Sequence, residues 1–269
     1  MKKIKILGLL MVLNLLIAAK PCRADFFDGG PWYMAKNQWE LFDAWDPEGR
    51  GQLTDANDRL NWITETGWTD NYDAFRAYGS RWAFDLSDDF EFTIGFHYDH
   101  TGNHDTDEGE LQMGLVWFND SYPTHAFSIA ASNVVERWDG KNLSNKNVFF
   151  ASMETPETKT DSWWRRNAND GMLYARYESS NDRLQFQTLE DNEATGGAQY
   201  SGLKQELGLN QLRVYLAGWS EGAGLVNGDA YFYNFEVHKG TIVPEPVSSI
   251  LFVIGGAVFT FRRKRRKSS

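Results

Sequence analysis

Apolar and polar residues alternate along the middle of this 269-residue chain in short segments that predict β-strands. These segments are rich in aromatic and β-branched residues, as half-buried strands are. The eight clearest segments are residues 90–97, 111–118, 125–131, 148–153, 172–177, 183–189, 212–219 and 230–238. Clusters of Asp, Asn, Ser and Gly lie between them and favour turns.

This spacing predicts an all-β fold, an antiparallel β-sandwich or jelly roll. A helical pattern is confined to residues 38–45 and 56–63, each of which predicts a short helix. No Pro-rich or Ser-rich linker divides residues 25–242, so we expect one domain there, which we call the body.

The body is strongly acidic. The first 24 residues hold five basic side chains and residues 262–267 hold six, which leaves 16 Lys and Arg against 36 Asp and Glu in residues 25–242, a formal charge of −20. Such a charge repels phosphate backbones and excludes nucleic acid as a partner. It could attract Ca²⁺, and it keeps an exported protein soluble.

The N-terminal segment has the pattern of a secretory signal peptide. Lysines precede an apolar stretch over residues 6–19, and Ala24 places a small residue at the last position before the predicted cleavage. We predict cleavage by signal peptidase after Ala24, with cleavage near Ala19 as the alternative. Cleavage after Ala24 removes Cys22, the single cysteine of the chain, and leaves a mature protein without disulfides.

The C-terminal segment, residues 243–269, combines three features. Pro244, Glu245 and Pro246 precede an apolar run over residues 247–261, and a basic cluster that begins with Arg262 and Arg263 follows. A run of 15 residues spans about 22 Å as a helix, short for a permanent anchor, and the basic cluster favours a body outside the membrane. The alternatives are a tail anchor and a processed sorting signal.

This tail resembles the PEP-CTERM sorting signal. The resemblance covers about the last 27 residues and implies recognition and cleavage by an exosortase in a Gram-negative bacterium that makes exopolysaccharide. It further implies a transient inner-membrane anchor through a transmembrane helix at 247–261, and then release to the cell surface or extracellular matrix. The tail carries no information about the activity of the body.

The strand pattern over residues 80–240 is similar to the concanavalin A-like lectin and glucanase fold. The closing pair of segments, LRVYLAGW and GDAYFYNFEV, carries most of this likeness. The resemblance implies a sheet that faces carbohydrate, in some members with Ca²⁺ and in others with glycoside hydrolysis.

Glycoside hydrolysis needs two carboxylates about 5 Å apart in retaining enzymes. The stretch that comes nearest to the spacing of laminarinase-type enzymes contains Asp105, Asp107 and Glu110, but an Asp replaces the first Glu of that pattern. These three residues are weak catalytic candidates, and we expect an acidic loop that leads into a strand. The sequence does not decide whether the protein is an enzyme.

A metal site has weak support as well. Asp99, His100, Asp105 and Asp107 lie close together in the sequence, yet nothing in their spacing brings them to one point. We therefore predict no resident cofactor, with Ca²⁺ left open.

Aromatic side chains offer a stacking surface for sugars. Trp163 and Trp164 are consecutive, so in a strand one of them faces solvent. Arg165 and Arg166 follow and could grip an acidic sugar, and Trp138 is a second aromatic candidate. Three functions follow: an exported surface protein that binds polysaccharide, a structural biofilm-matrix protein without a specific ligand, and a divergent glycoside hydrolase. We favour the first.

Overall fold

The computed structural model describes residues 26–27, 30–45, 49–65, 73–99, 108–119, 122–134, 146–191, 193–221 and 224–244. The predicted signal peptide and almost all of the predicted sorting tail lie outside these residues, so their predicted helices stay predictions. Pro244 is the last described residue and ends a strand. Among the described residues, no helix is long and apolar enough to cross a membrane.

Within the described ranges the chain forms two short 3₁₀ helices and fifteen strands. The helices are η1 (Trp32–Met34) and η2 (Lys36–Gln38). The strands are β1 (Trp39–Trp45), β2 (Gly51–Ala56), β3 (Arg59–Thr64), β4 (Asp73–Asp85), β5 (Phe90–Tyr98), β6 (Glu108–Asn119), β7 (Tyr122–Val134), β8 (Lys146–Glu154), β9 (Lys159–Arg165), β10 (Asp170–Glu178), β11 (Arg183–Glu190), β12 (Glu193–Ser201), β13 (Gln211–Glu221), β14 (Ala230–Lys239) and β15 (Ile242–Pro244).

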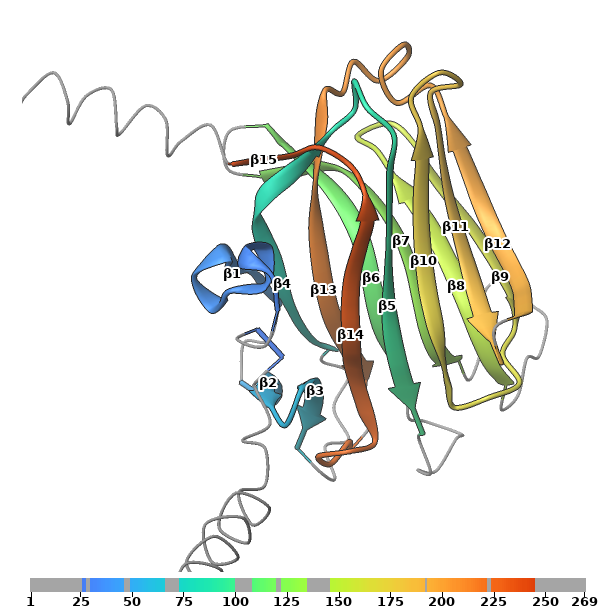
Figure 1. The fold of residues 1–269 in the computed structure, drawn as a ribbon. Helices are drawn as coiled ribbons and strands as arrows, with labels where there is room; N and C mark the ends of the chain where they lie inside the picture. Colours follow the sequence, from blue (N-terminus) through green and yellow to red (C-terminus); the bar gives the residue numbers. More distant parts are fainter. Residues whose placement is uncertain are drawn as a thin grey trace, which may run out of the picture.

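The strands form two antiparallel sheets. Sheet A has the order β1-β4-β13-β6-β7-β8-β9, and β15 pairs with β4. Sheet B has the order β12-β11-β10-β5-β14-β3-β2. Figure 1 shows the two sheets stacked, with β14, β5 and β10 of sheet B in front of β13, β6 and β7 of sheet A. The all-β antiparallel sandwich that the sequence predicts is confirmed, and all eight predicted segments lie in strands.

The space between the sheets is filled mainly by aromatic rings. Phe84 of sheet A stacks on Phe90 of sheet B with ring centroids 4.4 Å apart, and Trp82 meets Phe235 at 6.3 Å. Trp62 is fully buried and donates its Nε1–H to Ser220 Oγ across 2.7 Å. Each fully buried ring stabilises the fold by about 1.5–3 kcal/mol. Much of the aromatic content therefore serves packing.

The two predicted helices are wrong. Residues 39–45 form β1, which pairs with β4, and residues 56–63 span the turn between β2 and β3. Asn57 and Asp58 both adopt left-handed backbone angles, with φ of 57° and 61°. Two consecutive positive φ angles make the turn that suits a two-residue β-hairpin, and Asn and Asp accept that conformation at low cost. Local turn chemistry therefore overrides the helical spacing.

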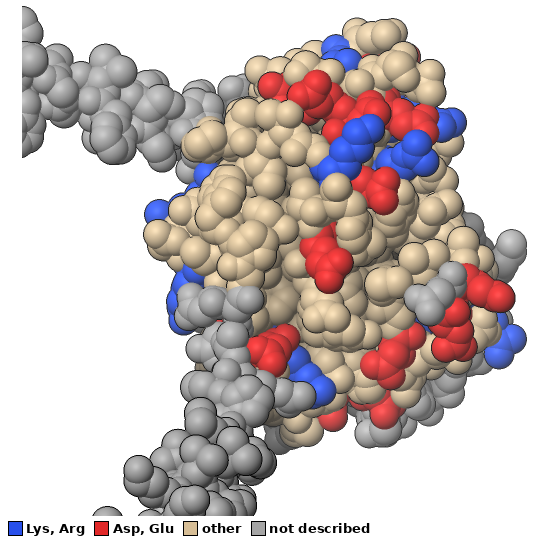
Figure 2. Space-filling view, viewed as in Figure 1, with Lys and Arg blue, Asp and Glu red and all other residues tan. Residues whose placement is uncertain are grey.

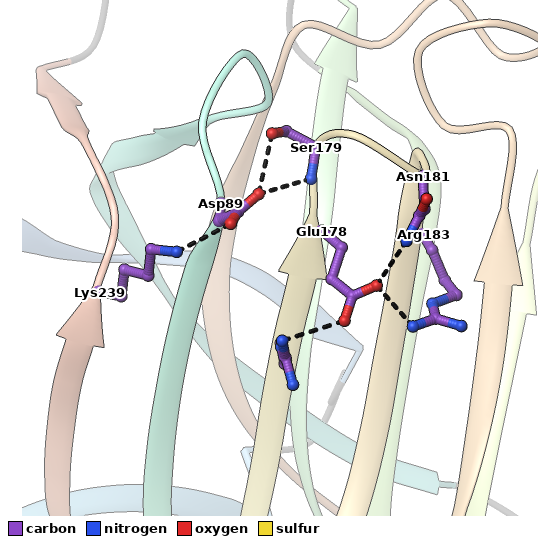
Figure 3. A network of polar contacts seen from close by, with 7 residues as sticks. Asp89, Glu178, Ser179, Asn181, Arg183 and Lys239 are labelled. Atoms are coloured by element: carbon purple, nitrogen blue, oxygen red, sulfur yellow. Dashed lines mark hydrogen bonds and ion pairs between the residues drawn. The ribbon is translucent and has the colours of Figure 1, made fainter.

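Polar side chains hold the end of sheet B where β10 turns into β11 (Figure 3). Asp89 accepts hydrogen bonds from Lys239 Nζ at 2.8 Å and from the backbone N–H and Oγ of Ser179 at 2.8 and 2.9 Å. These contacts, that of Lys239 first, hold the pKa of Asp89 well below its ordinary value. Next to Asp89, Glu178 binds three further side chains, those of Arg176, Asn181 and Arg183.

Candidate functional site

The outer face of sheet A is the first candidate for a binding surface. Successive residues of a strand point to opposite sides of the sheet. Phe127 of β7 and Leu216 of β13 lie in the core, so the residues directly before and after each of them face outward. Three neighbouring rows, each in the strand order β13, β6, β7, β8, β9, make up what we call the sheet A face. The rows are Tyr215, Gly114, Ser128, Ser152 and Asp161; Ala217, Gln112, Ala130, Phe150 and Trp163; and Trp219, Glu110, Ser132, Val148 and Arg165.

Side-chain size changes across this face. β7 contributes only small residues in these rows, Ser128, Ala130 and Ser132. Larger aromatic side chains stand on both sides of that strip, with Tyr215 on β13 and Trp163 on β9. Ser128, Ala130 and Ser132 are at most 3% exposed, so the accessible aromatic border of this face is the one at β9, where Trp163 lies.

Tyr215 is packed against the sheet. Its ring lies over Gly114, where an added Cβ would come within 2.3 Å of the ring, and only 5% of the residue is exposed. Burial raises the pKa of Tyr215, while a hydrogen bond with the Ser128 side chain acts in the opposite direction. Gln112 Nε2 donates to Ser128 Oγ across 3.1 Å. Three uncharged polar side chains therefore form one connected group on the sheet A face.

Trp163 and Trp164 divide between the two sides of β9. Trp163 points outward, pairs with Phe150, and is 50% exposed. Trp164 points inward, packs 6.0 Å from the Phe149 ring, and donates its Nε1–H to Thr188 Oγ1 across 2.9 Å. Trp163 is therefore the member of the pair that solvent, or a ligand, can reach.

Asp161 lies on the same strand, two residues before Trp163. Its Oδ1 is buried and accepts no hydrogen bond from the described part of the protein. Asp161 as a whole is half-buried, which places a carboxylate beside the exposed Trp163 on the outer side of β9. The sequence analysis did not single out Asp161, because nothing in the sequence shows which polar atoms the fold leaves without a partner.

Comparison with solved structures identifies the architecture. The carbohydrate recognition domain of Emp46p in its potassium-bound form has a TM-score of 0.50 and 11% identity over 81% of this chain and 96% of that chain. A mutant form of that domain has a TM-score of 0.51 at 11% identity, with coverage of 81% and 96%. A legume lectin-like domain from Entamoeba histolytica has a TM-score of 0.47 and 10% identity, over 76% of this chain and 91% of that one.

The body shares its two-sheet fold with the Emp46p domain. At these identities the likeness concerns the fold alone. No family model and no curated protein matches the chain.

The arginines that follow Trp164 have different surroundings in this β-sandwich. Arg165 is exposed in the third row of the sheet A face. Arg166 is only 3% exposed and donates to the carbonyl oxygens of Tyr98 and Ala168 at 2.9 and 2.8 Å. Burial lowers the pKa of Arg166. Its guanidinium is committed to the interior, so we expect Arg165, and not Arg166, to be available to a ligand on the surface.

The predicted catalytic and metal candidates are only partly described. Trp138, His100, Asp105 and Asp107 lie outside the described residues. Asp99 is described, and its backbone N–H donates to the carbonyl oxygen of Asp229 across 2.7 Å. In the described part of the chain, no group of three or more His, Cys, Asp or Glu side chains could hold a metal ion.

Glu110 lies on the sheet A face, between Trp219 and Ser132. Another carboxylate that faces the same way, Glu154, pairs with Ala126, six residues along β7 from Ser132. Six residues of strand span about 20 Å. The two carboxylates of a glycosidase stand at most about 9.5 Å apart, so Glu110 and Glu154 do not form such a pair.

Proposed function

We propose that this protein is an exported bacterial surface or matrix protein that binds polysaccharide through the sheet A face of its lectin-like body. The observation that carries this proposal is the exposed indole of Trp163, flanked on the outer side of β9 by the half-buried Asp161 and the exposed Arg165. An indole face stacks on the apolar face of a pyranose ring, and a carboxylate accepts hydrogen bonds from sugar hydroxyls. Trp163 supplies contact area in this proposal, and Asp161 supplies orientation.

Gln112 on β6, which is half-buried, extends the proposed contact across the sheet A face from Trp163 on β9. Across sheet A, neighbouring strands are about 4.8 Å apart, so the four strands from β9 to β6 span about 14 Å. That width accommodates more than one sugar ring. The proposal is therefore for binding along a polymer chain.

Export and sorting belong to the same proposal and rest on the sequence. Signal peptidase would remove residues 1–24, and an exosortase would act on the tail that begins with Pro244, Glu245 and Pro246. The tail would deliver the body to the surface or matrix, where exopolysaccharide is the available polymer. The carbohydrate recognition domain of Emp46p, whose fold the body shares, adds support for a sugar ligand.

The test is a polysaccharide and glycan-array binding screen of the full-length protein, with Ca²⁺ and with chelator. We expect saturable binding that falls at least tenfold in Trp163→Ala. The matched control is Trp32→Ala, because Trp32 is 54% exposed in η1, away from the sheet A face. Circular dichroism confirms that both variants are folded.

Two results would refute the proposal. The first is no saturable binding by folded protein, which would favour a structural matrix protein without a specific ligand. The second is binding that Trp163→Ala leaves intact. Dependence on Ca²⁺ would direct attention to acidic segments of the body.

A further inference from the structure

The outer face of sheet B carries a second aromatic surface, on the opposite side of the sandwich from the sheet A face. It consists of Tyr231 and Tyr233 on β14, His97 on β5, Met172 on β10 and Arg59 on β3. We call these five residues the sheet B face. Figure 2 views the molecule from this side, with charged side chains gathered toward its ends and a largely uncharged surface between them.

Tyr233 lies flat on the sheet. It pairs with Gly95, where an added Cβ would come within 2.4 Å of the tyrosine ring. Because Gly95 has no side chain, one face of the ring rests against β5. The residue is only half-buried, so its ring is accessible to a ligand from outside.

Tyr231 is held between two polar neighbours. Its ring stacks on His97 with centroids 4.8 Å apart and an interplanar angle of 18°, and His97 Nδ1 lies 2.8 Å from Asp170 Oδ1. The guanidinium carbon of Arg59 lies 4.0 Å from the Tyr231 ring centroid. A cation over an aromatic face is attracted by the negative charge density of the ring. Tyr231 is only 8% exposed, so its ring is held in place and supports the Arg59 guanidinium that lies over it.

Arg59 has no carboxylate partner among the described residues, whereas Arg81, Arg176, Arg183 and Arg213 each form an ion pair with a glutamate. It also lies beside Tyr233. Phe232 pairs with Leu60, so the antiparallel order brings Arg59 alongside Tyr233 at the next position, and the Tyr231 and Tyr233 rings are 5.9 Å apart. The sheet B face thus joins an accessible ring to a guanidinium that forms no ion pair within the described residues, while the nearby carboxylate of Asp170 is bound to His97.

We propose that the sheet B face is a second saccharide site, specific for a carboxylate-bearing sugar such as a uronic acid. The sugar ring stacks on Tyr233, and its carboxylate pairs with the Arg59 guanidinium, which offers planar, bidentate donors. The net charge of the body opposes acidic polymers at long range. At 0.15 M salt that field is screened beyond about 8 Å, so the contact with Arg59 decides binding.

The test measures binding of full-length protein to a galacturonic acid oligosaccharide and to its carboxyl-reduced, neutral counterpart by titration calorimetry. We expect the acidic ligand to bind at least tenfold more tightly to the wild type. Arg59→Gln removes that difference, and Tyr233→Ala weakens binding of the acidic ligand at least tenfold. The control is Arg176→Gln, because Arg176 is on the same side of sheet B but pairs with Glu178 at 3.1 Å, and it leaves the preference unchanged.

Trp163→Ala separates this inference from the proposed function. It leaves binding of the acidic oligosaccharide within twofold of the wild type, because Trp163 lies on the other sheet. Loss of that binding in Trp163→Ala, with retention in Arg59→Gln, would overturn the sheet B site while the sheet A proposal stands. A wild-type protein that shows no preference for the acidic ligand would overturn the inference whatever it binds through sheet A.

Discussion

The outer faces of the two sheets share an architecture and differ in chemistry. Each has a tyrosine ring lying on a glycine, Tyr215 on Gly114 in sheet A and Tyr233 on Gly95 in sheet B. In sheet A the ring is buried and its neighbours are small and uncharged. In sheet B the ring is half exposed and lies near Arg59 and the His97–Asp170 pair. The two faces therefore differ in the accessibility of this ring, because a ligand can reach Tyr233 but not Tyr215.

The largest expected change in the free energy of unfolding comes from the two tryptophans of β9, and it tests which of them faces outward on the sheet A face. Trp164→Ala should lower the free energy of unfolding by about 3 kcal/mol, because it empties space in the core and removes the bond to Thr188. Trp163→Ala should cost less than about 1 kcal/mol, since half of that side chain is already in solvent. Urea denaturation followed by fluorescence measures both. Equal losses would contradict the assigned orientation of β9.

The sequence could predict that one of these two tryptophans is exposed, but not which. The alternation of side chains along β9 is the same in either orientation, and only pairing with β8 brings Trp164 beside Phe149 and Trp163 beside Phe150. The eight predicted strands could be recognised from the sequence because each alternates apolar and polar residues. β9 and β12 lack this alternation, because they are edge strands and keep several polar side chains exposed.

A second pair of variants sharpens the comparison of the two tyrosines. Gly114→Ala should lower the free energy of unfolding by about 2 kcal/mol, because the new methyl group meets a Tyr215 ring that is packed in place. Gly95→Ala should cost about 1 kcal/mol or less, because the half-exposed Tyr233 can rotate into solvent. Thermal and urea unfolding measure the difference. A larger loss in Gly95→Ala would show that Tyr233 is the more tightly held ring.

The smallest expected effect concerns the charges at the end of sheet B. Lys239 and Ser179 hold the pKa of Asp89 below its ordinary value, so the ionised carboxylate stabilises the folded protein above about pH 4 and loses that contribution as the pH falls further. Because the Asp89 side chain is 37% exposed, we expect Asp89→Asn to cost less than about 1 kcal/mol at pH 7.

The measurement compares urea midpoints of wild type and Asp89→Asn at pH 7 and pH 3. The difference should shrink at pH 3, and it should shrink at high salt. A double-mutant cycle with Lys239→Gln isolates the ion pair, which is 2.8 Å long. A difference that grows at pH 3 would contradict the assigned sign.

The sequence alone could not predict that the candidate residues of sheet B lie together. Arg59 falls in a segment with helical spacing, and His97, Asp170 and Tyr231 are separated from it by many residues of chain. The pairing of β14 with β3 and β5 brings them together, and long-range pairing of this kind leaves no local signal. The Asn57–Asp58 turn was a readable clue to the hairpin that carries Arg59.

The short strand β15 has a mechanical consequence. Its three residues pair with Phe84, Ala83 and Trp82 on the edge of β4, and Pro244 contributes no N–H to that pairing. A pulling force applied to the chain at Pro244 therefore acts first on this short pairing. β15 can peel from β4 while the long ladders of both sheets remain intact, so a force at this end is expected to break the three-residue pairing before it disturbs either outer face.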